Sequence, residues 1–233
     1  MSLIAGKLKK HFCVKPTCVD VDVVRGVQSM KVLNSRDVVI SGVKSVNSEL
    51  YHVVIDGCEG VAVQDARIVA PGSSPNTDGI HVQSSSAVTI TGASIQTGDD
   101  CISVGPGTSN LRVEHVSCGP GHGISIGSLG KESEEGGVEN VTVRGAAYVG
   151  TENRLRIKRW GRAARTGAYV RGGGCGHARM RDVSNPIIID QSYCPNDGGQ
   201  GCPHQVPYAP PPTHRIPSPS RLMRRCLDRG VKF

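Results

Sequence analysis

A repeat of roughly 22 residues runs through this sequence and limits the folds that it can adopt. Short β-branched runs recur along the chain, bounded by Gly, Asn, Asp or Ser. Such runs are typical of strands rather than helices, and self-similarity at a period of about 20 to 50 residues indicates stacked units. One series is anchored on Ile55, Ile80, Ile102, Ile124, Ile157 and Ile189.

A second series of runs follows out of phase with the first. Two or three strands per unit, 30 glycines and no helical period predict an all-β chain folded as a right-handed parallel β-helix. A β-sandwich or propeller is the alternative, but antiparallel sheets need hairpin dipeptides between neighbouring strands. The second series comprises Val38–Ile40, Val61–Val63, Val88–Ile90, Leu111–Val113 and Val141–Val143.

Polar motifs precede three consecutive strands of the first series. NTDGIH spans 76–81, GDDC spans 98–101 and GHG spans 121–123. Because equivalent positions of successive coils stack about one strand spacing apart, the side chains of these motifs should gather at one end of one sheet. Two cations beside Ile157 should lie on the same face. The predicted cluster comprises Asp78, Asp99, Asp100, His122, Arg156 and Lys158.

Three crowded carboxylates repel one another, so at least one should have a raised pKa and keep its proton near neutral pH. An acid beside a base is what glycoside hydrolysis requires. An Asp before a strand is also a common turn cap, and a carboxylate cluster can bind a cation such as Ca²⁺. Three aspartates and a histidine on consecutive coils favour a catalytic site, and the neighbouring Arg156 and Lys158 disfavour a bound cation.

Five ordered motifs resemble the plant-type polygalacturonases of glycoside hydrolase family 28, which have a pectin-lyase-like solenoid fold. The likeness runs from about Val32 to Gln205. It is carried by NTDGIH, TGDDC at 97–101, CGPGHGISIGSLG at 118–130, RIK at 156–158 and NPIIIDQSYCP at 185–195.

The resemblance implies hydrolysis of α-1,4 links between galacturonic acids of pectin, with inversion at the anomeric carbon and a role in cell-wall modification. Asp99 would be the general acid, and Asp78 and Asp100 would together activate water, with an acid-to-base separation of roughly 6.5 to 9.5 Å. No metal or organic cofactor is implied. The residues that would assist the acid or bind substrate are His122, Asn76, Arg156, Lys158 and Tyr193.

Two other functions stay open. An inactive pectate-binding relative, or a non-functional gene product, would keep the sheet face without cutting. A rhamnogalacturonan or xylogalacturonan hydrolase is disfavoured by RIK, because Arg binds a carboxylate through paired hydrogen bonds and Lys adds a point charge.

Nine cysteines leave at least one thiol unpaired in a monomer, the state that we expect. By the resemblance, Cys101 pairs with Cys118 and Cys194 pairs with Cys202, which implies secretion, here to the cell wall. Cys58 lies beside an inward strand and should be a buried free thiol. The apolar run in MSLIAGKLKKHF is too short for a signal peptide or a membrane span, so we expect no membrane association and an N-terminally incomplete β-helix.

Charge and patterning divide the chain into an irregular N-terminal segment over 1–21, a partial β-helix over 22–205 and a Pro- and Arg-rich tail over 206–233. Within the β-helix, alternation disappears over 159–176 and resumes near 177. Residues 154–181 hold nine Lys or Arg and no acid, so the basic pI of about 9.0 originates largely in the unusual segments.

This basic balance suggests a polyanionic partner. Pectate is favoured over nucleic acid, because the Arg- and Gly-rich stretches lack interleaved aromatics, which make up 3% of the chain. Our hypothesis is that 159–176 and 206–233 come from an altered reading frame or unspliced sequence. A genuine basic insertion with a disordered tail is the alternative.

Overall fold

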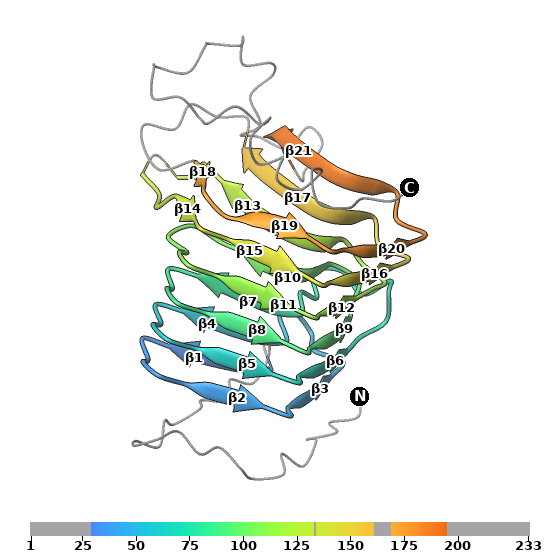
Figure 1. The fold of residues 1–233 in the computed structure, drawn as a ribbon, viewed down its shortest axis with the longest axis horizontal. Helices are drawn as coiled ribbons and strands as arrows, with labels where there is room; N and C mark the ends of the chain where they lie inside the picture. Colours follow the sequence, from blue (N-terminus) through green and yellow to red (C-terminus); the bar gives the residue numbers. More distant parts are fainter. Residues whose placement is uncertain (1–28, 133, 161–168, 195–233) are drawn as a thin grey trace.

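The chain folds into a stack of coils, and each complete coil contributes one strand to each of three parallel sheets (Figure 1). A computed structural model describes residues 29–132, 134–160 and 169–194. The first sheet, which carries the polar motifs, has the order β1-β4-β7-β10-β13-β17-β21. Its strands are β1 (Met30–Leu33), β4 (Val53–Asp56), β7 (Ile80–Gln83), β10 (Asp100–Val104), β13 (Gly123–Leu129), β17 (Asn153–Trp160) and β21 (Asn185–Tyr193).

The other two main sheets have six strands each, and a pair of short strands adds a small fourth sheet. The second sheet contains β2 (Val39–Ser41), β5 (Ala62–Gln64), β8 (Thr89–Thr91), β11 (Arg112–Glu114), β15 (Thr142–Arg144) and β19 (Gly174–Gly176). The third contains β3 (Lys44–Val46), β6 (Arg67–Val69), β9 (Ser94–Gln96), β12 (Ser117–Cys118), β16 (Ala147–Val149) and β20 (Arg179–Arg181). The small sheet pairs β14 (Val138–Glu139) with β18 (Val170–Arg171).

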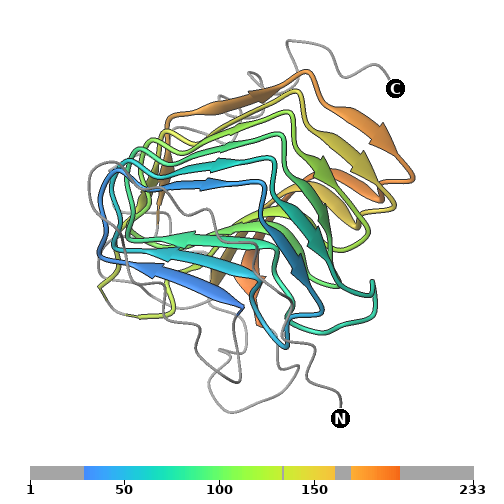
Figure 2. The same ribbon diagram turned by 90° about the horizontal axis from the view of Figure 1, so that it is seen from below.

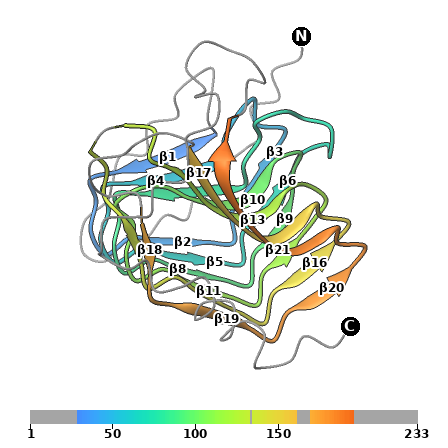
Figure 3. The ribbon, with the colours of Figure 1, turned by 90° about the horizontal axis from the view of Figure 1, so that it is seen from above.

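Views along the stack show the sheets as faces around one interior (Figures 2 and 3). Every strand pairing in the described part of the chain is parallel, and the interior is filled by ladders of β-branched side chains such as Ile80, Ile102 and Ile124, each fully buried. The prediction of an all-β right-handed parallel β-helix is confirmed. Among the described residues, no helix is long and apolar enough to span a membrane.

The second series of predicted strands is in the predicted register throughout. Ile40 pairs with Val63, Val63 with Ile90, and the ladder continues through Val113 to Val143. Each run buries its first and third residues, as Val61 and Val63 show, and a slip of one residue would turn both to the outer face.

Two steps of the first series, from Ile55 to Ile80 and from Ile124 to Ile157, were wrong by two residues. Ile80 pairs with Val53 rather than Ile55, and Ile124 pairs with Leu155 rather than Ile157. A shift of two residues keeps every side chain on its own face of the sheet, so alternation could not separate these registers.

The segment 159–176 was expected to lack strands until about residue 177. Instead, β18 and β19 lie within it and continue the small and second sheets, and Cys175 is buried in the core. The predicted segments 1–21 and 206–233 lie outside the described residues, as do 161–168.

Candidate active site

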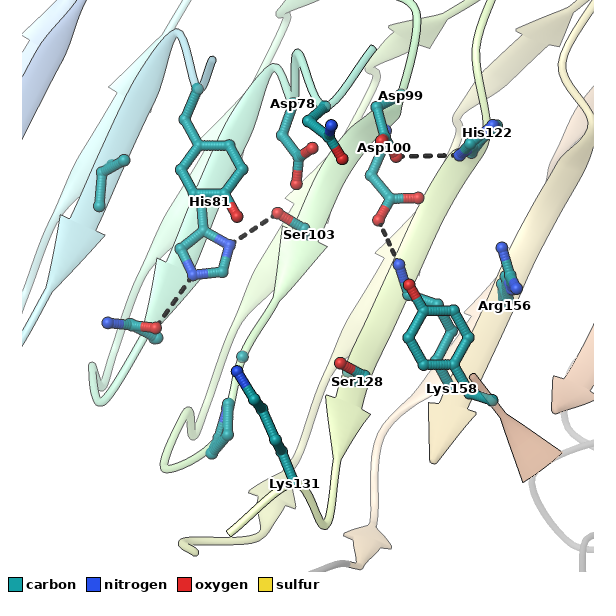
Figure 4. A pocket seen from close by; sticks show the side chains of 18 of the residues that line it. Asp78, His81, Asp99, Asp100, Ser103, His122, Ser128, Lys131, Arg156 and Lys158 are labelled. Atoms are coloured by element: carbon teal, nitrogen blue, oxygen red, sulfur yellow. Dashed lines mark hydrogen bonds and ion pairs between the residues drawn. The ribbon is translucent and has the colours of Figure 1, made fainter. Parts of the chain in front are cut away.

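The predicted cluster forms at one end of the first sheet, where the polar motifs enter their strands (Figure 4). Asp78 lies two residues before β7, Asp100 begins β10, and Asp100 pairs in register with Gly123 beside His122. The ladder therefore places the aspartates and the histidine on consecutive coils, about 4.8 Å apart along the stack.

Asp100 is fully buried and paired on both of its oxygens. The Lys158 Nζ lies 2.8 Å from Oδ2, and the Ser125 hydroxyl donates to Oδ1 at 2.5 Å. The Lys158 side chain is 9% exposed and that of Asp100 2%. A carboxylate removed from water to this degree needs such a counter-charge and donor.

Asp78 is the carboxyl group that keeps its proton. Its burial, together with the negative charges of Asp100 and Asp99, raises its pKa to about 8. It is therefore protonated at neutral pH, although Ser103 and Lys158 oppose the shift.

Asp99 and His122 form a hydrogen-bonded pair. The His122 Nδ1 lies 2.9 Å from the Asp99 Oδ1, which also accepts the Asp100 amide at 2.8 Å. Burial acts to raise the pKa of Asp99, but the hydrogen bond and charge of His122 outweigh it, so the pKa is lowered. The same hydrogen bond raises the pKa of His122. The pair thus shares a proton that resides mainly on the imidazole.

A second carboxylate contacts the same imidazole. The Glu152 Oε2 lies 3.4 Å from the His122 Nε2, and the Glu152 amide donates to the Gly121 carbonyl at 2.8 Å. Glu152 was not among the predicted residues. It lies one residue before β17, and its contact with His122 depends on the β13–β17 register that alternation did not resolve.

The glycines of GHG are required by close backbone approach. A Cβ on Gly123 would lie 1.9 Å from the Asn153 carbonyl oxygen, and one on Gly121 would lie 2.4 Å from the Asp99 carbonyl oxygen. Both glycines have positive φ, 84° and 116°. The turn can therefore bring His122 against Asp99, and the His122 amide also donates to the Asp99 carbonyl at 2.8 Å.

The predicted substrate-binding residues line the same cleft, whose volume is about 470 Å³. The guanidinium of Arg156 and the ammonium of Lys158 lie 5.4 and 5.5 Å from the centre of the Tyr193 ring. Asn76 lies on the wall near Asp78. All of the predicted site residues are thus brought together.

Several other lining residues were missed. Tyr51 stacks on His81 with ring centres 5.0 Å apart, and His81 is hydrogen-bonded to Ser103 at 2.7 Å. Each lies on the outward face of its strand or in the turn before it, and the outward alternation marks these positions but not their shared cleft. The remaining lining residues that were missed include Lys31, Lys131 and Glu135.

The cluster also has the composition of a cation site. Asp99, Asp100 and His122 present ligand atoms within 4.8 Å of one another. The Lys158 ammonium already neutralises Asp100, and a divalent cation beside it would be repelled.

The disulfide between Cys101 and Cys118 joins neighbouring coils as predicted, and Cys58 is a buried free thiol. Cys194 is disulfide-bonded, while Cys202, its predicted partner, lies outside the described residues. Cys175, for which no partner was predicted, is also disulfide-bonded.

Comparison with known proteins gives consistent similarities. The family model described as "Glycosyl hydrolases family 28" matches residues 20–209. A polygalacturonase of Prunus persica is 55% identical over 181 residues, 78% of this chain and 45% of the relative. An exopolygalacturonase of Platanus acerifolia is 45% identical over 171 residues, 72% of this chain and 43% of the relative. The chain therefore spans less than half the length of these relatives.

Solved structures agree on the architecture. The polygalacturonase of Erwinia carotovora ssp. carotovora superposes with a TM-score of 0.62 at 33% identity, covering 72% of this chain and 44% of that one. An endo-xylogalacturonan hydrolase from Aspergillus tubingensis gives 0.66 at 26% identity, covering 72% of this chain and 46% of that one.

Proposed function

The chain belongs to glycosyl hydrolases family 28, and from this premise we propose that it hydrolyses α-1,4-galacturonosidic bonds of polygalacturonate with inversion. The observation that carries the proposal is the opposite shift of two neighbouring carboxyl groups. The pKa of Asp78 is raised and that of Asp99 is lowered within one cleft. Such divergence is the usual mark of a working acid and base.

In the proposed mechanism, Asp99 gives a proton to the leaving glycosidic oxygen while water, activated by Asp78 and Asp100, attacks the anomeric carbon from the opposite side. Asp99 is the most accessible of the three, and its Oδ1 is held by His122 and by the Asp100 amide. Its Oδ2 is left to face the substrate.

In the substrate-free cleft the protons lie on Asp78 and on His122 rather than on Asp99, the proposed acid. The assignment therefore requires two proton movements before bond cleavage. One proton passes from His122 to Asp99, and Asp78 releases its proton to bulk solvent so that it can accept one from the attacking water. The reverse assignment, with Asp78 as the acid, is what the substrate-free proton positions would favour.

A leaving-group comparison separates these assignments. Replacing the general acid by Asn abolishes hydrolysis of polygalacturonate but spares substrates with a good leaving group, which need no protonation. We expect Asp99→Asn to hydrolyse galacturonosyl fluoride and Asp78→Asn to lose both activities. The opposite pattern would reverse the two roles.

The activity itself is tested by the release of reducing ends from polygalacturonate, with Asp99→Asn as the control. We expect release by the unmodified chain well above that by the variant. Equal background release from both would identify an inactive relative rather than a hydrolase.

We also propose that the protein acts on pectin outside the cell. The Cys101–Cys118 disulfide supports an oxidising compartment, and the cations of the cleft support an acidic glycan. When the product of the complete gene carries a fluorescent protein, we expect fluorescence in the cell wall. Fluorescence in the cytosol would contradict the proposal.

A further inference from the structure

The cations that line the cleft differ in whether they already have a partner. Arg156 lies 3.2 Å from Asp190, and Lys158 is paired with the buried Asp100. Within the described part of the chain, Lys31 and Lys131 have no carboxylate within ion-pair distance. The charge of these two ammonium groups is therefore not offset by a neighbouring carboxylate of the described residues.

Lys31 and Arg156 lie five strand pairings apart in one outward row. The strand registers align Lys31, Val54, His81, Ser103, Ser125 and Arg156 across six neighbouring strands. At about 4.8 Å per strand, Lys31 lies roughly 14 Å to one side of the β10 position and Arg156 roughly 10 Å to the other. The aspartates lie between two separate positive positions.

An aromatic platform lies on the Lys31 side of the aspartates. The rings of Tyr51 and His81 are stacked at an interplanar angle of 12°, and Val54 is buried beside them. Burial and the nearby charge of Asp78 raise the pKa of Tyr51 to about 12, so its hydroxyl keeps its proton as a donor. An apolar ring with a polar tip suits a sugar, which has both kinds of surface.

Lys131 lies in a loop that is held by hydrogen bonds within the loop itself. The amides of Gly130 and Glu132, on either side of Lys131, each donate at 2.7 Å to a different oxygen of the Glu135 carboxylate. Glu135 is thereby occupied by the backbone. Figure 4 shows the Lys131 side chain extending into the cleft on the His81 side, away from Arg156.

We infer that Lys31, Lys131 and the Tyr51–His81 platform form a second subsite for an acidic sugar, on the side of the aspartates opposite Arg156 and Lys158. The inference rests on the proposed function for the identity of the sugar. It implies that the chain recognises free carboxylates of galacturonate units on both sides of the bond that is cut. Methyl esterification of the units at this subsite would weaken binding.

Titration calorimetry with an oligogalacturonate of defined length tests this inference. The Asp99→Asn background prevents turnover, and the fully methyl-esterified oligomer of the same length serves as the neutral probe. Lys31→Gln and Lys131→Gln should each raise the Kd for the acidic oligomer about threefold to fivefold, as for exposed ion pairs. Neither should change the Kd for the ester, and added salt should shrink the difference.

The matched control is Lys44→Gln, an exposed lysine of β3 outside the cleft, which should leave both constants unchanged. Equal affinity of the cleft variants and the Asp99→Asn parent, or equal loss for acid and ester, overturns the subsite. If the titrations follow expectation while the unmodified chain releases no reducing ends, the subsite stands and the hydrolase proposal fails. Absence of oligomer binding by every variant overturns the inference.

Discussion

Replacing Lys158 by Met should destabilise the fold far more than a surface substitution would. The Lys158 Nζ lies 2.8 Å from the Asp100 Oδ2, and both side chains are nearly excluded from water. At an effective dielectric constant of about 20 the attraction is about 6 kcal/mol, part of which offsets the cost of desolvating both groups. Removing one partner of such a pair costs about 3 to 5 kcal/mol, because the other charge stays buried without compensation.

Urea unfolding followed by circular dichroism measures this loss. We expect Lys158→Met to lower the free energy of unfolding by about 3 to 5 kcal/mol at pH 7. Lys131→Met, a matched substitution at an exposed position of the same cleft, should change it by less than about 0.5 kcal/mol. The double variant Lys158→Met with Asp100→Asn should recover much of the loss, because it leaves no buried charge.

Two results would refute this reasoning. An unchanged urea midpoint for Lys158→Met would show that the Lys158–Asp100 pair does not stabilise the fold. A double variant no more stable than Lys158→Met would show that the loss comes from packing of the lysine side chain rather than from the charge of Asp100.

Three further predictions follow from other contacts. His52 is fully buried, and burial lowers its pKa from 6.5 to about 4. Its ionisation therefore leaves the free energy of unfolding unchanged above about pH 6.5 and lowers it by up to about 3 kcal/mol as the pH falls to about 4. The His52→Gln variant should lose less stability over this window in urea titrations, and parallel curves for variant and parent would contradict this. Glu152→Gln should lower the pKa of His122 and move the alkaline limb of the pH profile for hydrolysis to lower pH, whereas superimposed profiles would exclude this role of Glu152. Removing the Cys101–Cys118 disulfide by Cys118→Ser should lower the free energy of unfolding by about 3 kcal/mol. An unchanged melting temperature would refute this prediction.

The coiling of the chain could be predicted from the sequence because each short run of the second sheet places two apolar inward residues around one outward residue, as Val61 and Val63 do. The first sheet was less determined. Val53 and Ile55 are both buried, so either could be the partner of Ile80. The third sheet formed no recognisable series, because its inward ladder runs through residues of mixed type: Ile68, Ile95, Cys118 and Tyr148.

At the site, residue identities were predictable but their protonation was not. The repulsion of three aspartates predicts one raised pKa, yet the choice of Asp78 depends on Lys158 compensating Asp100 from two coils away. Lys31 escaped notice for a similar reason. Its place opposite Arg156 emerges only when five consecutive strand pairings are known.

The distance between paired strands of the first sheet does not depend on how many residues connect them. Ile102 and its partner Ile124 are 22 residues apart in sequence, whereas Ile124 and its partner Leu155 are 31 apart, yet each pair is one strand spacing apart in space. Lengthening a turn costs little closure entropy. Insertions between coils can therefore reshape the walls of the cleft, and with them its choice of glycan, while the separations among Asp78, Asp99 and His122 stay the same.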